Sequence, residues 1–103
     1  MFIEKCLKYE LETNGYNVKQ QLDVKINYFD LEFESDLKID LLVNDCIVVE
    51  LKTVETVLPI HEAQILTYMK LLQRPQGLLI NFNTTNISKT MKPFVNEYFQ
   101  ILD

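Results

Sequence analysis

The chain has 103 residues, of which 48% are apolar, and it contains only 2 Gly and 3 Pro. This composition excludes a disordered tail and provides no Gly- or Pro-rich linker, so we expect a single domain over residues 1–103. The 15 Asp and Glu outnumber the 10 Lys and Arg, and the formal net charge is −5. That balance is opposite to the basic footprint of most nucleic-acid-binding proteins.

The sequence shows no pattern typical of a membrane helix or a secretory signal. No apolar run reaches the roughly 18 residues that a membrane helix needs, and the N-terminus does not have the pattern of a signal peptide. Cys6 and Cys46 have no CxxC spacing and are expected to be reduced thiols. We therefore predict a cytoplasmic protein with no membrane partner.

The first predicted element is a helix over residues 2–13, which the pair Asn14-Gly15 ends. Apolar side chains recur there at helical spacing. The predicted buried stripe consists of Phe2, Ile3, Cys6, Leu7, Tyr9 and Leu11.

Strands follow. Residues 18–28 alternate with a period of two, which predicts a half-exposed strand. Its predicted buried face consists of Val18, Leu22, Val24, Ile26 and Tyr28. Three further strands are predicted at residues 31–34, 37–43 and 46–52, the last of them apolar enough to be central.

The second half of the chain begins with a predicted helix from Pro59 to about Gln73, with Ile60, Ala63, Leu66 and Met69 at helical spacing. A strand at residues 78–82 follows, and residues 91–102 fit either a short helix or a final strand. The predicted order is α-β-β-β-β-α-β, an α/β fold with a central mixed β-sheet flanked by helices.

Charged residues interrupt the predicted strands at Asp40, Glu50 and Lys52. Burying an unpaired ion is costly, so charges in a central strand indicate either a pairing or a function. Two carboxylates can hold a hard divalent cation, and an ammonium group beside them can stabilise charge on a phosphate. The structural alternative is that Glu50 and Lys52 form an ion pair or lie in solvent at a strand end.

The turn between the two charged strands tests this hypothesis. A two-residue hairpin at Asn44-Asp45 would turn Asp40 and Glu50 to opposite faces of the sheet. A three-residue loop that includes Cys46, or a bulge, would pair Asp40 with Glu50. The hypothesis therefore requires an odd-length loop or a bulge.

The following helix carries polar side chains on one face. His61, Gln64 and Tyr68 are spaced by three and four residues. Gln64 and Tyr68 are candidates to support the site, although a polar helix rim is the alternative. His61 alone is typical of a capping or surface residue.

These residues carry a resemblance to a known family. The segments 40–43, 47–52 and 58–64, followed by 78–82, resemble the small bacterial GxxExxY proteins of the PD-(D/E)XK nuclease superfamily. The resemblance implies a restriction-endonuclease-like fold and cleavage of DNA with Mg²⁺ or Mn²⁺. It implies that Asp40 and Glu50 are the metal-binding acids.

The resemblance also implies roles for three other residues. Lys52 would position or polarise the attacking water, and Gln64 and Tyr68 match the QxxxY helix motif of the RecB-like branch. The N-terminus departs from the family, because the Gly and Glu of its name motif would precede Met1. Ile3 stands where the Tyr would be, and Glu4 does not align with the motif Glu. The alignment therefore predicts no helix-borne Glu at the site.

Two functions follow from the sequence. The first is a metal-dependent nuclease-like domain with Asp40, Glu50, Lys52, Gln64 and Tyr68 as site residues. The second is an interaction module for nucleic acid or protein on the same fold, which the acidic charge favours. A subunit whose partner supplies the DNA surface, or an oligomer, is a third hypothesis.

Overall fold

The computed structural model describes residues 2–28, 31–83 and 91–99, and for residues 25–28 and 31–36 the backbone alone. The elements, in order, are helix α1 (Phe2–Thr13), strands β1 (Val18–Tyr28), β2 (Leu31–Val43) and β3 (Ile47–Lys52), helix α2 (Pro59–Leu71), and strands β4 (Gln76–Asn81) and β5 (Lys92–Val95). None of the described helices has the length and apolar character that a membrane crossing requires.

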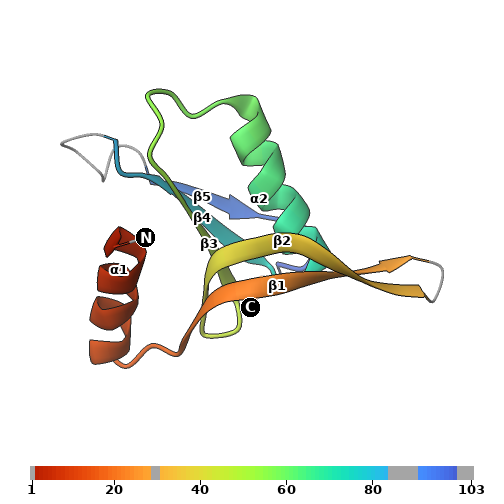
Figure 1. The fold of residues 1–103 in the computed structure, drawn as a ribbon, viewed down its shortest axis with the longest axis horizontal. Coiled ribbons are helices and arrows are strands. Elements are labelled where there is room, and N and C mark those ends of the chain that lie inside the picture. Colours follow the sequence, from red (N-terminus) through yellow and green to blue (C-terminus); the bar gives the residue numbers. More distant parts are fainter. Residues whose placement is uncertain (1, 29–30, 84–90, 100–103) are drawn as a thin grey trace.

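The five strands form one mixed sheet in the order β1-β2-β3-β4-β5. β3 and β4 are parallel, with α2 as the crossover between them, and the other pairs are antiparallel. Figure 1 shows β1 and β2 extending together beyond the rest of the sheet. The α/β prediction of a central mixed sheet with flanking helices is confirmed.

The element order differs from the predicted α-β-β-β-β-α-β in two places. The predicted strands at 31–34 and 37–43 are one strand, β2, because pairing with β1 continues along it apart from one irregularity between Asp23 and Lys25. The C-terminal segment adds the edge strand β5 at Lys92–Val95, so the strand alternative for residues 91–102 holds over these four residues, and residues 96–99 form neither helix nor strand.

The two helices pack on opposite faces of the sheet, each over its own apolar cluster (Figure 1). The cluster under α2 comprises Val24, Ile39, Leu42, Val48, Ile65, Tyr68, Met69 and Leu79. The cluster under α1 comprises Val18, Leu41, Val43, Val49, Leu51 and Ile80, with Leu7 and Leu11 packed against it.

The predicted helical stripes were partly wrong. Phe2 is 79% exposed, Tyr9 is 70% exposed and Cys6 is exposed, so the buried face of α1 is narrower than predicted. On α2, Ile60 and Leu66 are exposed, and the helix buries Ile65, Tyr68 and Met69 instead. The buried face of α2 is therefore rotated from the stripe that apolar counting favours, whereas Leu7 and Leu11 of α1 pack on the sheet as predicted.

Gly77 marks the closest approach between β4 and α2. A Cβ atom added there would lie 2.5 Å from Met69 Sδ and 3.2 Å from Ile65 Cδ1. We expect Gly77→Ala to lower the free energy of unfolding by about 1–3 kcal/mol through overpacking, measured by urea denaturation. In a Met69→Ala background the same change should cost less. An equal cost in both backgrounds would show that the methionine is not the obstacle.

Candidate active site

The hairpin between β2 and β3 has the geometry that the site hypothesis required. Val43 pairs with Ile47 and Leu41 with Val49, so three residues, Asn44 to Cys46, form the turn. Asn44 and Asp45 both adopt positive φ, at 53° and 54°, a region that Asn and Asp tolerate better than most residues. Continuing this register places Asp40 opposite Glu50, on the same side of the sheet.

Asp40 and Glu50 are each bonded to the backbone of the other strand. The Leu51 N–H donates to Asp40 Oδ2 at 2.7 Å, and the Asp40 N–H donates to Glu50 Oε1 at 3.3 Å. Neither carboxylate is an exposed surface acid, because Glu50 is only 4% exposed and Asp40 is partly buried. The reciprocal bonds hold the two groups side by side with free oxygen lone pairs on each.

Burial and neighbouring negative charge raise the pKa of both acids. Burial first, and then the charge of Asp40, raise the pKa of Glu50 from 4.5 to about 7. Burial likewise raises the pKa of Asp40, while the hydrogen bond from Leu51 opposes the rise. A pair of acids that resist ionising together is a site where a bound cation would be strongly favoured.

Lys52, Gln64 and Tyr68 form a hydrogen-bonded row from β3 to α2. Lys52 Nζ donates to Gln64 Oε1 at 2.9 Å, and Gln64 Nε2 donates to the Tyr68 hydroxyl at 2.9 Å. Tyr68 is 4% exposed, so it anchors the row in the core. The positive charge of Lys52 also acts on both Asp40 and Glu50, lowering the pKa of each.

Tyr68→Phe removes the hydroxyl that accepts from Gln64 and leaves the ring in place. We expect a loss of about 1 kcal/mol in the free energy of unfolding. We also expect a decrease of up to about tenfold in any metal-dependent cleavage, because Gln64 would hold Lys52 less firmly. The control is Tyr9→Phe, which removes the hydroxyl of an exposed tyrosine on α1. Unchanged cleavage in Tyr68→Phe would separate the row from the chemistry.

His61 lies beside this row and caps the helix. Its Nδ1 accepts the N–H of Leu58 at 2.9 Å, at the first turn of α2. His61 therefore has the capping role that the sequence suggested.

The sequence prediction missed Glu4, and the expectation of no helix-borne Glu at the site is wrong. Glu4 is the buried residue of α1, only 2% exposed. Its carboxylate acts directly on the Asp40 side chain, and its charge contributes to the raised pKa of both Asp40 and Glu50. Spacing could have indicated this, since Glu4 precedes Leu7 by three residues and Leu11 by seven, on the same helical face.

Two consecutive glutamines of β1 hold Glu4 in place. Gln20 Nε2 donates to one carboxylate oxygen and Gln21 Nε2 to the other, both at 2.6 Å. Neighbouring strand residues normally point to opposite faces, but Gln21 has φ +52°. This left-handed residue allows both amides to reach the same carboxylate.

Gln21 also marks where β1 changes the face that it buries. Val18 packs in the cluster under α1, whereas Leu22 and Val24 pack with the cluster under α2. The prediction that all three share one face is therefore wrong, and the side chains of Ile26 and Tyr28 lie outside the described ones. A left-handed conformation costs a non-glycine residue about 1–2 kcal/mol, which the bond from Gln21 to Glu4 helps to offset.

Comparison with known proteins identifies the fold family. A family model described as the PD-(D/E)XK nuclease superfamily matches residues 1–94. The chain belongs to the PD-(D/E)XK nuclease superfamily. A solved structure, titled "Crystal structure of SSO0001", matches with a TM-score of 0.68 at 18% sequence identity. The match covers 91% of this chain and 49% of that one, so this chain spans about half the length of its structural neighbour. A search of curated proteins found no match.

Members of the PD-(D/E)XK superfamily typically use divalent metals, and we tested whether these residues fit one. Within the described part of the chain, no three His, Cys, Asp or Glu side chains are arranged to hold a metal ion. Mg²⁺, however, usually takes only one or two protein carboxylates and completes its shell with water and substrate oxygens. Asp40 and Glu50 supply that number, and a bound cation would offset the burial and the neighbouring negative charge that raise the pKa of each acid.

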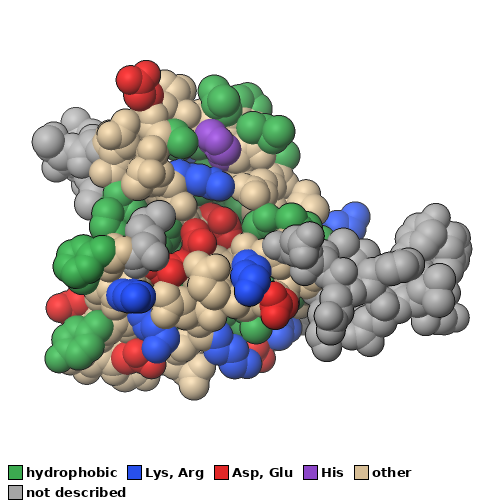
Figure 2. Space-filling model, viewed as in Figure 1, with side chains coloured by type: hydrophobic (Ala, Val, Ile, Leu, Met, Phe, Trp, Pro, Cys, Tyr) green, Lys and Arg blue, Asp and Glu red, His purple; other side chains and the backbone are tan. Residues whose placement is uncertain are grey.

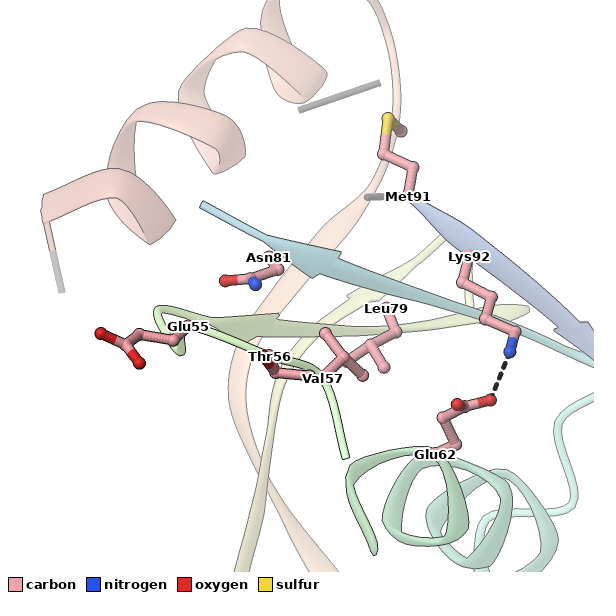
Figure 3. A pocket seen from close by; sticks show the side chains of 8 residues that line it. All are labelled: Glu55, Thr56, Val57, Glu62, Leu79, Asn81, Met91 and Lys92. Atoms are coloured by element: carbon pink, nitrogen blue, oxygen red, sulfur yellow. Dashed lines mark hydrogen bonds and ion pairs between the residues drawn. The ribbon is translucent and has the colours of Figure 1, made fainter. Parts of the chain in front are cut away.

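A hollow lies between the N-terminal turns of α2 and the strands β4 and β5. It has a volume of about 460 Å³, and the Lys92–Glu62 ion pair stands at one wall (Figure 3). Its lining consists of Glu55, Thr56, Val57, Glu62, Leu79, Asn81, Met91 and Lys92. None of the five predicted site residues lines it.

Asn81, at the end of β4, is the buried polar residue of that hollow. Its side chain accepts the Val54 N–H at 3.1 Å and donates to the Val54 carbonyl at 2.7 Å. Asn81 is also the register partner of Lys52. It therefore fixes the segment that leaves β3 directly after Lys52.

Proposed function

We propose that this chain is a metal-dependent nuclease-like domain that hydrolyses phosphodiester bonds of nucleic acid, with DNA the favoured substrate. One arrangement of side chains carries the proposal. Asp40 and Glu50 each hydrogen-bond the backbone of the other's strand. Beside them, Lys52 is oriented by Gln64, which in turn bonds the buried Tyr68. Superfamily membership supports the reaction class. We also propose that residues 1–103 form one domain and that it acts in the cytoplasm.

Each residue of the site has a role that follows from its contacts. Asp40 and Glu50 would hold Mg²⁺ or Mn²⁺, which supplies neutralisation of the phosphate charge and lowers the pKa of a bound water. Lys52 would orient the attacking water or the phosphate through its ammonium group. Gln64 restricts the position of that ammonium, and Tyr68 restricts Gln64.

Glu4 would support Asp40 as a neighbouring charge rather than bind the metal in its place. Its two oxygens already accept from Gln20 and Gln21, so the glutamines satisfy much of its hydrogen-bonding capacity. Its charge adds to the negative potential at Asp40 and thereby increases the affinity of the pair for a cation.

An interaction module remains the second candidate, because one observation favours it. The net charge of −5 opposes binding to a polyanion. Figure 2 shows acidic side chains gathered in the middle of one face, below the histidine. A protein partner that supplies a basic surface would reconcile this charge with a nuclease fold.

A nuclease assay tests the proposal. The protein would be incubated with labelled single- and double-stranded DNA and with RNA, in Mg²⁺, Mn²⁺ or EDTA. We expect cleavage that needs the metal and is lost in Asp40→Asn, whereas Asp45→Asn, at an exposed acid of the β2–β3 turn, should cleave normally. Cleavage that survives EDTA or Asp40→Asn contradicts the proposed site, and no cleavage of any substrate favours the interaction module.

A further inference from the structure

A pocket adjoins the candidate active site on the side of α2. It has a volume of about 580 Å³, within the range of sites that bind small molecules. Lys52, Gln64 and Tyr68 form one wall, and the remaining lining residues are Leu37, Ile60, His61 and Thr67. Because Lys52 lines this pocket, a group bound in it could belong to the same nucleotide as a phosphate held at Lys52.

Two of the other lining residues are apolar and exposed. Ile60 is 70% exposed and Leu37 is 40% exposed, and the two come from different elements, α2 and β2. Exposed branched side chains facing a hollow offer a surface on which a flat apolar group can lie. The apolar side chains of Ile60 and Leu37 cannot bind a phosphate, so they suit a different part of the substrate.

His61 adds a defined hydrogen-bond donor to the same pocket. Since its Nδ1 accepts the Leu58 N–H, the neutral ring carries its proton on Nε2. The pocket thus combines apolar walls, an imidazole ring and a polar row, which together match a heteroaromatic ring with carbonyl groups at its edge.

The net charge of the chain bears on whether such a ligand would be a paired or an unpaired base. Duplex binding draws most of its affinity from many Lys and Arg contacts to phosphates, and 15 acids against 10 basic residues do not provide them. Base contacts must then supply affinity. Bases in a duplex are paired and stacked, and only an unpaired base can enter a pocket.

We propose that this pocket binds an unpaired nucleobase next to the scissile phosphate, so that the site acts on single-stranded nucleic acid or on frayed ends. The inference rests on the proposed function for its phosphate at Lys52. It adds a substrate class and two residues, Ile60 and Leu37, that determine it without taking part in the chemistry.

Fluorescence anisotropy of labelled oligonucleotides tests the pocket, with Ca²⁺ in place of Mg²⁺ to separate binding from cleavage. The probes are a single strand, the same strand with abasic sites throughout, and the blunt duplex. We expect the normal single strand to bind at least about tenfold more tightly than the other two. Ile60→Ser should weaken its binding by about five- to tenfold.

Leu66→Ser is the matched control, because Leu66 is an exposed apolar residue of α2 that does not line the pocket. It should bind like the unchanged protein. Equal binding of abasic and normal strands, tighter binding of the duplex, equal effects of the two serine variants, or no binding of any probe would each overturn the inference.

A parallel cleavage assay in Mg²⁺ separates this result from the proposed function. Metal-dependent cleavage at equal rates of normal and abasic strands would support the nuclease proposal and contradict the pocket inference. Base-dependent binding that Ile60→Ser weakens, without cleavage of any probe, would support the pocket and contradict the nuclease proposal.

Discussion

Lys52→Met should reduce metal-dependent cleavage by about 10²–10³-fold while the fold and the cation affinity persist. Methionine keeps the unbranched stem of lysine but removes the ammonium group that bonds Gln64 at 2.9 Å. A preorganised charge aimed at a phosphate contributes that factor when it acts in a site shielded from water. The measurement is single-turnover cleavage, with circular dichroism to check the fold.

Two further variants separate charge from geometry at this position. Lys52→Arg retains the positive charge but presents it on a planar guanidinium in place of the compact ammonium group, so it should recover only part of the rate. Gln64→Leu retains the ammonium but frees it from its partner, and should lie between the unchanged protein and Lys52→Met. If Lys52→Met cleaves at the unchanged rate, the row from Lys52 to Tyr68 is a structural support only.

Glu50→Gln should stabilise the protein at about pH 8 in the absence of divalent cations, but not at about pH 4. The pKa of Glu50 is raised in the fold from 4.5 to about 7. Between these values the folded state binds more protons than the unfolded state, so stability falls as pH rises through this window. The full cost, at most about 3 kcal/mol, is present above the folded pKa.

Glutamine removes this ionisation and can still accept the Asp40 N–H through its amide oxygen. Urea denaturation in EDTA at the two pH values measures the effect, with Glu55→Gln as the control at an exposed acid. A variant that is less stable at pH 8, or equally altered at both pH values, would show that burial does not penalise the Glu50 charge.

The helix bounds could be predicted well from the sequence, for local reasons. α1 runs from Phe2 to Thr13, as predicted, because Asn14-Gly15 is a strong local stop. The parity of the β2–β3 turn could be stated from the sequence as a condition, and the register of the structure meets it. Propensity and parity act over a few residues, so they are visible in one dimension.

Features that depend on distant partners were not predictable in this way. Glu4 is buried because Gln20 and Gln21, 16 and 17 residues away, satisfy its carboxylate, and apolar counting assigns a glutamate to the surface. Ser35 and Asp36 broke the apolar pattern and divided the predicted strand. The β1–β2 register is interrupted at the same place, between the pairs Asp23–Lys38 and Lys25–Glu34, but pairing with β1 on both sides of the interruption keeps β2 one strand. Tertiary pairing overrode local preference in both cases.

Calorimetric titration of Mn²⁺ into the unchanged protein and into Asp40→Ala tests the central claim, a cation site at Asp40 and Glu50, most directly. We predict binding to the unchanged protein, loss of that binding in the variant, and a free energy of unfolding that holds or rises as repulsion with Glu50 is relieved. Unchanged Mn²⁺ binding in Asp40→Ala, combined with a large loss of stability, would contradict the account and make this acid a structural residue.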